Sequence, residues 1–209
     1  MVRLWRFWRK QSGEQPDRCL AFLNKEAGQE YVLRVEKQRL PEEDRHTKEK
    51  ARITQDHTDR GMLSSTAYTS AIIQERIQHL RNRILIVREQ LFAVVEARGI
   101  RLRQKKVKAI IDYLRSCFSE QGQGLLAEYS ALHVQHRLPA GDLKSVTMQI
   151  DMILTAETVK EVALRVADIE NKRKAARRAL VIKWAEKLMW VVVGAGVLEL
   201  VRWLSGWGD

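Results

Sequence analysis

Apolar residues recur at alternating intervals of four and three positions through the middle of the chain. From Ile73 to Val94 the steps are four, three, four, three, four and three, which is the heptad spacing of a helix with one apolar face. Extra apolar residues beside this face, such as Ile72 and Phe92, widen it beyond that of a two-stranded coil. The pattern favours a helix of a bundle, or a trimeric or larger coil. It also predicts self-association through a seam formed by Ile73, Ile77, Leu80, Ile84, Val87, Leu91 and Val94.

Helical spacing continues on both sides of this seam. We expect helices over about 102–118 and 125–137, with a hinge or tight connection at Gln121–Gly124, and a last helix that begins near Leu143 and resets near Thr155. Residues 42–60 hold six acids and five bases but almost no apolar residue, so they are expected to form an exposed helix or a mobile linker. The fold class that follows is all-α, an elongated antiparallel helical bundle or coiled coil with a C-terminal membrane-associated helix.

Four segments are expected from these shifts in composition. Residues 1–15 form a basic amphipathic N-terminal segment, and residues 16–61 form a polar, charge-rich helical or linker region. Residues 62–183 form the helical bundle or coiled-coil domain. Residues 184–207 form a C-terminal hydrophobic membrane anchor.

The C-terminal segment joins a basic run to an apolar run. The uncharged run Leu188–Leu198 is eleven residues long, against roughly 20 for a helix that spans a bilayer, so the sequence leaves open whether it spans or lies in the interface. The predicted anchor is Trp184, Leu188, Trp190, Val193, Leu198 and Trp203. The predicted anionic-lipid collar is Lys172, Arg173, Lys174, Arg177, Arg178 and Lys183. Glu199 and Arg202 stand three apart and are a candidate intramembrane pair.

A second basic cluster spans residues 98–108, at the start of the helix expected at 102–118. The chain has 37 Lys and Arg against 26 Asp and Glu, a net charge of +11, so an anionic partner surface is favoured. The basic patch is Arg98, Arg101, Arg103, Lys105, Lys106 and Lys108. It suits an anionic leaflet or a protein, suits nucleic acid less well because no aromatic residue interleaves the bases, and is otherwise a solvated helix face.

No residue pattern indicates an enzyme. The five histidines and two cysteines match no metal or nucleophile motif, so neither catalytic residues nor a cofactor is predicted. His46 is expected to be exposed and His79 to flank the seam as a polar residue.

The function favoured by the sequence is a membrane-anchored helical interaction or scaffold protein that self-associates. Its expected partners are an anionic lipid membrane and further copies of the chain, with the N-terminal bulk on the cytoplasmic side. One alternative is a membrane-active effector of pore or holin type that uses Glu199 and Arg202. Another is a basic helical nucleic-acid-binding module.

Overall fold

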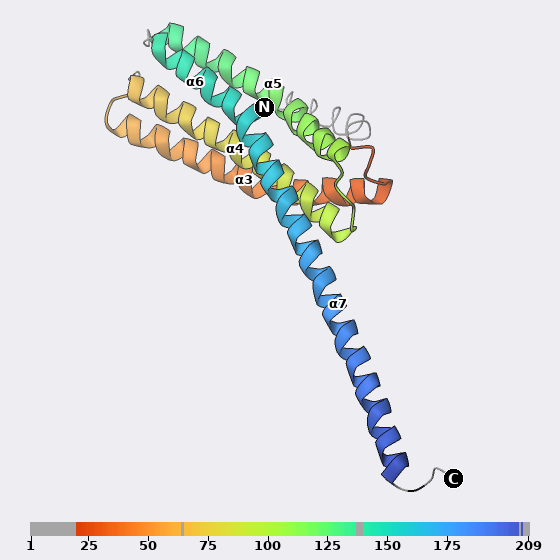
Figure 1. The fold of residues 1–209 in the computed structure, drawn as a ribbon. Coiled ribbons are helices and arrows are strands. Elements are labelled where there is room, and N and C mark those ends of the chain that lie inside the picture. Colours follow the sequence, from red (N-terminus) through yellow and green to blue (C-terminus); the bar gives the residue numbers. More distant parts are fainter. Residues whose placement is uncertain (1–19, 64, 137–139, 205, 207–209) are drawn as a thin grey trace. The chain divides into compact units, whose positions relative to one another are not determined.

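Every regular element that the structure describes is helical. The computed structural model describes residues 20–63, 65–136, 140–204 and 206. Within them the order is α3 (Lys25–Asp59), α4 (Thr66–Ala97), α5 (Gln104–His136), α6 (Ala140–Met152), the π-helical turn η1 (Ile153–Glu157) and α7 (Thr158–Leu204) (Figure 1). The all-α prediction is therefore confirmed for this part of the chain. The predicted amphipathic segment 1–15 lies outside the described residues.

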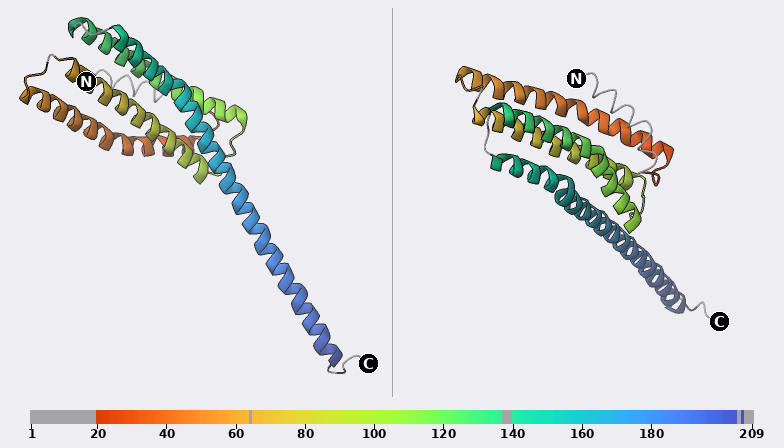
Figure 2. Two further views of the ribbon diagram at one scale, coloured as in Figure 1. Left: turned by 60° about the vertical axis from the view of Figure 1, so that its left-hand side comes forward. Right: turned by 90° about the horizontal axis from the view of Figure 1, so that it is seen from above.

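The chain divides into two compact units at a point inside α7. The first unit ends at Arg165 and the second begins at Val166. Gly61, where a domain edge was expected, lies instead in the turn between α3 and α4, and these two helices pack on each other (Figure 2). The charge-rich residues 42–59 are therefore part of a packed helix of the first unit.

Local sequence signals explain where α3 and α4 begin and end. The side chains of Asn24 and Ser65 accept hydrogen bonds from the backbone N–H groups of Ala27 (2.9 Å) and Tyr68 (3.1 Å), and so cap the two N-termini. Gly61 and Gly99 follow the C-termini with φ of 64° and 61°, a left-handed conformation that costs glycine little. Both glycines thus end a helix and let the chain turn back.

Helix α4 lies at the centre of the first unit and contacts both α3 and α5. All seven residues of the predicted seam are buried within a single chain. Removal of these side chains from water is the main stabilising contribution of such a face. The seam is therefore an internal face of the bundle in this single chain.

Helix α5 is continuous through Gly122 and Gly124, so the hinge expected at Gln121–Gly124 is wrong. A Cβ atom at Gly122 would lie 3.0 Å from Leu154 Cδ1 and 3.1 Å from Ile150 Cγ2. The missing side chain therefore allows α6 and η1 to approach α5 closely. The first glycine serves packing, which outweighs the cost of about 1 kcal/mol for glycine inside a helix.

Between α6 and α7 the helix widens for one turn, near Thr155, where an interruption of the last helix was expected. Residues Ile153–Glu157 are π-helical, and the hydroxyl of Thr158 donates to the Ile153 carbonyl at 2.7 Å. A π-helical turn accommodates one residue more than an α-helical turn.

Helix α3 continues through Pro41 but is held differently on its two sides. Before Pro41, the residues Ala27, Tyr31 and Val35 are buried, and the Tyr31 hydroxyl lies 3.1 Å from the Tyr113 hydroxyl of α5. After Pro41, none of the described α3 residues is fully buried. The second half of α3 is therefore held mainly by polar contacts.

Candidate functional site

The predicted anchor residues all lie on α7 in the second unit. They are helical and their side chains are exposed, from 48% for Val193 to 81% for Trp203. Other large apolar side chains of residues 180–204 are exposed as well, including Val181, Met189 and Leu200. The second unit therefore presents an exposed apolar surface that is uninterrupted over residues 188–198. Such a surface usually marks a binding site for a protein or a membrane.

None of the described helices is long and apolar enough to cross a bilayer. A C-terminal helix that spans the bilayer, one of the two possibilities left open by the sequence, is therefore not supported. The eleven uncharged residues Leu188–Leu198 are framed by Lys187 and Glu199, which limits the apolar length.

The predicted collar forms the part of α7 that precedes the apolar surface. Lys174, Arg177, Arg178 and Lys183 are exposed, and Lys172 pairs with Asp168 at 2.9 Å one turn earlier. The ammonium of Lys187 lies 5.8 Å from the centre of the Trp184 ring, within the range of a cation–π contact. Basic and aromatic groups thus adjoin on the same helix.

Glu199 and Arg202 are both exposed near the end of α7. Their separation of three residues places them on one side of the helix, as expected.

The predicted basic patch divides into locally engaged and exposed residues. Arg98 pairs with Glu30 at 3.0 Å and with Glu26 at 3.4 Å, and Lys106 lies 5.8 Å from the Phe22 ring centre. The remaining members are exposed: Arg101 and Arg103 just before α5, and Lys105 and Lys108 in its first turns. Part of the patch therefore contributes to packing between helices.

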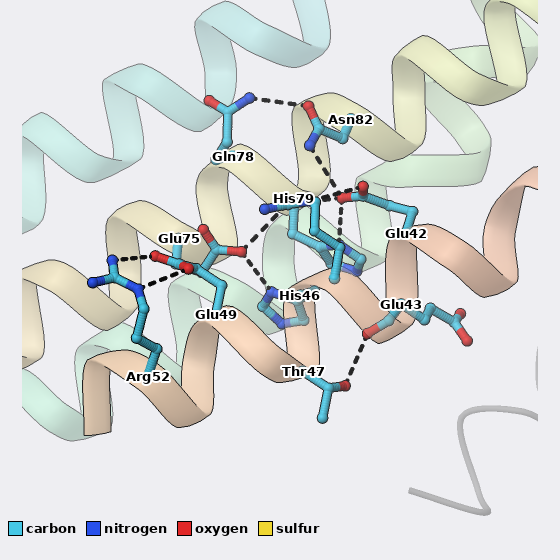
Figure 3. A network of polar contacts seen from close by, with 11 residues as sticks. Glu42, Glu43, His46, Thr47, Glu49, Arg52, Glu75, Gln78, His79 and Asn82 are labelled. Atoms are coloured by element: carbon cyan, nitrogen blue, oxygen red, sulfur yellow. Dashed lines mark hydrogen bonds and ion pairs between the residues drawn. The ribbon is translucent and has the colours of Figure 1, made fainter. Parts of the chain in front are cut away.

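A polar cluster between α3 and α4 was not predicted. The rings of His46 and His79 stack with centres 4.0 Å apart and planes 11° apart (Figure 3). His46 Nδ1 lies 3.1 Å from Glu75 Oε1, and His79 Nδ1 lies 3.2 Å from Glu42 Oε1. Each imidazole on one helix thus faces a carboxylate on the other. His46 is only 19% exposed, so its expected exposure is wrong.

Two further residues complete the cluster. Arg45 bonds to Glu42 at 2.9 Å and to Glu75 at 3.4 Å, so one guanidinium joins both carboxylates. Asn82 donates to Glu42 at 3.1 Å. Burial acts to raise the pKa of Glu42, but the hydrogen bonds from Arg45, Asn82 and His79 outweigh it and bring the pKa to about 2.

The environment of His79 favours the neutral imidazole. Burial lowers its pKa below the ordinary 6.5, and the neighbouring His46 lowers it further, whereas the bond to Glu42 acts in the opposite direction. Among the described residues no group of three or more His, Cys, Asp and Glu side chains could hold a metal ion. His79 therefore resists protonation while it is held in the cluster.

A signal for this cluster exists in the sequence. His46 stands fifteen residues before Gly61, and His79 stands eighteen residues after it. In a hairpin of two antiparallel helices, residues at similar distances from the turn lie opposite each other. The expectation of a domain edge at Gly61 concealed that pairing.

No family model matches the chain, and searches of curated proteins and of solved structures return no match.

Proposed function

We propose that this chain is a helical scaffold held at an anionic membrane surface by the second unit. The observation that carries the proposal is the exposed apolar surface of α7, which is uninterrupted over residues 188–198 and follows the basic collar. The proposal requires association with the bilayer and does not require that the helix cross it.

The distribution of apolar side chains around α7 favours lipid over a protein groove. Residues 188–193 are six consecutive apolar residues, and all six are exposed. Because successive residues of a helix are about 100° apart, they cover its whole circumference. A groove on a partner protein covers one side of a helix, whereas acyl chains surround it.

The length of the apolar run limits how deep it reaches. Eleven residues extend about 16 Å along a helix, roughly half of a hydrocarbon core of about 30 Å. The six Leu and Val residues of this run contribute about 0.3–0.6 kcal/mol each on insertion, or about 2–4 kcal/mol together. Apolar burial alone therefore gives modest membrane affinity.

The exposed residues of the collar, together with Lys187, supply a contribution of similar size. Lys174, Arg177, Arg178, Lys183 and Lys187 are five exposed bases within fourteen residues, and each adds about 1 kcal/mol close to an anionic leaflet. Binding should therefore require acidic lipid and weaken as salt increases, because the Debye length shortens.

Vesicle flotation of the full chain tests the proposal. We expect the protein to float with vesicles that contain phosphatidylserine, and to stay mostly in the soluble fraction with vesicles of neutral phosphatidylcholine alone. Substitution Val193→Asp should weaken flotation by about tenfold or more, because a carboxylate in the apolar segment costs about 2.5–3.5 kcal/mol.

Leu33→Asp is the matched control. Leu33 is also an exposed apolar residue on a helix, but it lies on α3 in the first unit, so its substitution should leave flotation unchanged. Equal flotation of the two variants would refute the proposal. If Val193→Asp instead changes the sedimentation coefficient without lipid, then another copy of the chain covers the apolar surface.

The double substitution Glu199→Leu and Arg202→Leu separates a scaffold from a pore. A scaffold should bind vesicles more tightly after the change, because two charges no longer oppose insertion. Neither the unmodified scaffold nor the double variant should release dye from vesicles. Leakage caused by the unmodified protein and lost in the double variant would instead support the pore-type alternative.

A further inference from the structure

The two halves of α3 are attached to the bundle by different kinds of contact. Residues before Pro41 bury apolar side chains, which are insensitive to pH. Residues after it contact α4 through the histidine cluster and at Tyr68. The Tyr68 hydroxyl lies 3.3 Å from Thr54 Oγ1, and its ring centre lies 5.4 Å from that of His57. A change of charge in the cluster therefore acts on the half of α3 that has little apolar burial to retain it.

Pro41 marks the boundary between these halves. Proline has no backbone N–H, so one i→i−4 hydrogen bond of the helix is missing there. The first cluster residue, Glu42, follows immediately, and Arg45 and His46 lie one turn later. The helix is thus weakest at the place where its mode of attachment changes.

The charges around the two imidazoles accommodate one proton better than two. Glu42 and Glu75 contribute two negative charges, and Arg45, which bonds to both, contributes one positive charge. With neutral imidazoles these groups sum to −1, so one proton neutralises the cluster and a second leaves a net positive charge. The other charged groups around the site leave this sum unchanged, because three arginines balance three acids: Arg39, Arg52 and Arg83 against Glu36, Glu43 and Glu49.

A second proton would also place two positive rings in contact. The ring centres are 4.0 Å apart in a partly buried interface, where water screens like charges less than it does at an open surface. Stacking of neutral imidazoles is favourable, whereas stacking of two imidazolium ions is repulsive.

We propose that the His46–His79 pair is an acid-sensitive switch, which holds residues 42–59 of α3 on α4 near neutral pH and releases them when both imidazoles are protonated. The direction follows from linkage. A histidine that resists protonation in the closed state binds its proton more readily once released, so the closed state is lost as pH falls below about 6.5. The pKa of Glu42, at about 2, keeps that carboxylate ionised throughout this range.

Hydrogen–deuterium exchange of the full chain tests the switch. Protection is compared at about pH 7.5 and about pH 5.5, after correction for the intrinsic exchange rate at each pH. We expect residues 42–59 to lose up to about tenfold in protection at the lower pH, the limit for one histidine that stays neutral when closed and titrates near 6.5 when released. Residues 25–40 should change much less.

Variants identify the histidine pair as the cause. In the double variant His46→Gln and His79→Gln, the acid-dependent loss should disappear, because glutamine does not titrate. The matched control is His57→Gln, which removes a histidine from the same half of α3 but outside the stack. His57 Nδ1 lies 2.9 Å from the Ile53 carbonyl oxygen, and its ring contacts Tyr68 of α4 with centres 5.4 Å apart, so this control also touches the α3–α4 interface. This control should retain the acid response.

Two results would overturn the switch. One is an equal change in protection over 42–59 and 25–40 in the unmodified chain. The other is an unchanged acid response in the double variant. If circular dichroism shows that the double variant is not helical at neutral pH, the test rests on the unmodified chain. The comparison is then between the change in protection of residues 42–59 and that of residues 25–40.

Discussion

Basic residues are placed differently in the two units. In the first unit, arginines of α4 pair with acids of other helices. Arg81 pairs with Glu157 at 3.0 Å, and Arg88 pairs with Glu161 at 3.0 Å. In the second unit, the bases from Lys174 to Lys187 are exposed. These two arginines of the first unit join helices to one another, whereas the bases of this run in the second unit face solvent.

Apolar residues show the same contrast. The seam of α4 is buried, whereas the apolar run of α7 is exposed. The difference lies in the distribution around the helix: the seam is one face, and the run covers every side. Apolar residues on one face can be buried by neighbouring helices of the same chain, whereas an apolar circumference needs a surrounding medium.

The largest effect should separate the two apolar surfaces. Leu91→Ala in the seam should lower the free energy of unfolding of the first unit by about 2–5 kcal/mol, because a fully buried side chain leaves a cavity. Leu188→Ala on α7 should change it by less than about 0.5 kcal/mol, because Leu188 is exposed. Denaturant unfolding of both variants measures the difference, and similar losses would contradict the contrast.

A second comparison uses glycines inside helices. Gly122→Leu should destabilise the first unit by about 1–3 kcal/mol, because the added side chain meets Leu154 and Ile150. Gly196→Leu should not destabilise it, because nothing lies within 4 Å of a Cβ atom at Gly196. Thermal unfolding followed by circular dichroism checks both. An unchanged midpoint for Gly122→Leu would show that α6 and η1 move aside without cost.

The smallest expected effect concerns one arginine from each unit. For both variants, the free energy of unfolding and the binding to vesicles are measured. Arg88→Met should lower the free energy of unfolding by about 1 kcal/mol, through loss of its hydrogen bonds to Glu161 and Glu89. Arg178→Met should leave stability unchanged and weaken binding to phosphatidylserine vesicles by about 1 kcal/mol. If Arg88→Met also weakens vesicle binding while the protein stays folded, the assignment of bases to separate roles is wrong.

Much of the fold could be predicted from the spacing of apolar residues. The 4–3 spacing from Ile73 to Val94 identified both the helix and its buried side chains, because the period of a helix is fixed by its backbone. The spacing could not say that the partner helices lie in the same chain. Gly122 was read as a break, since the close approach that explains it depends on Ile150 and Leu154, which are distant in sequence.

The candidate surfaces were predictable to different extents. The collar and the apolar run are contiguous in sequence, so composition located them. The His46–His79 pair depends on how α3 lies along α4, which follows from packing and the turn at Gly61. Residues 42–60 were expected to be exposed because of their composition. A helix that packs through polar side chains has the same composition as a solvated helix.

The π-helical turn has a consequence for insertions and deletions. The buried residues Val146, Ile150, Ile153, Thr158 and Val162 follow one another in steps of four, three, five and four. Deletion of one residue between Ile153 and Thr158 would reduce the step of five to four, which suits a regular α-helix and keeps the buried residues on one side. A deletion within a regular turn of α6 would instead rotate all following residues by about 100°. The chain can therefore lose one residue at this turn while its buried side chains keep their neighbours.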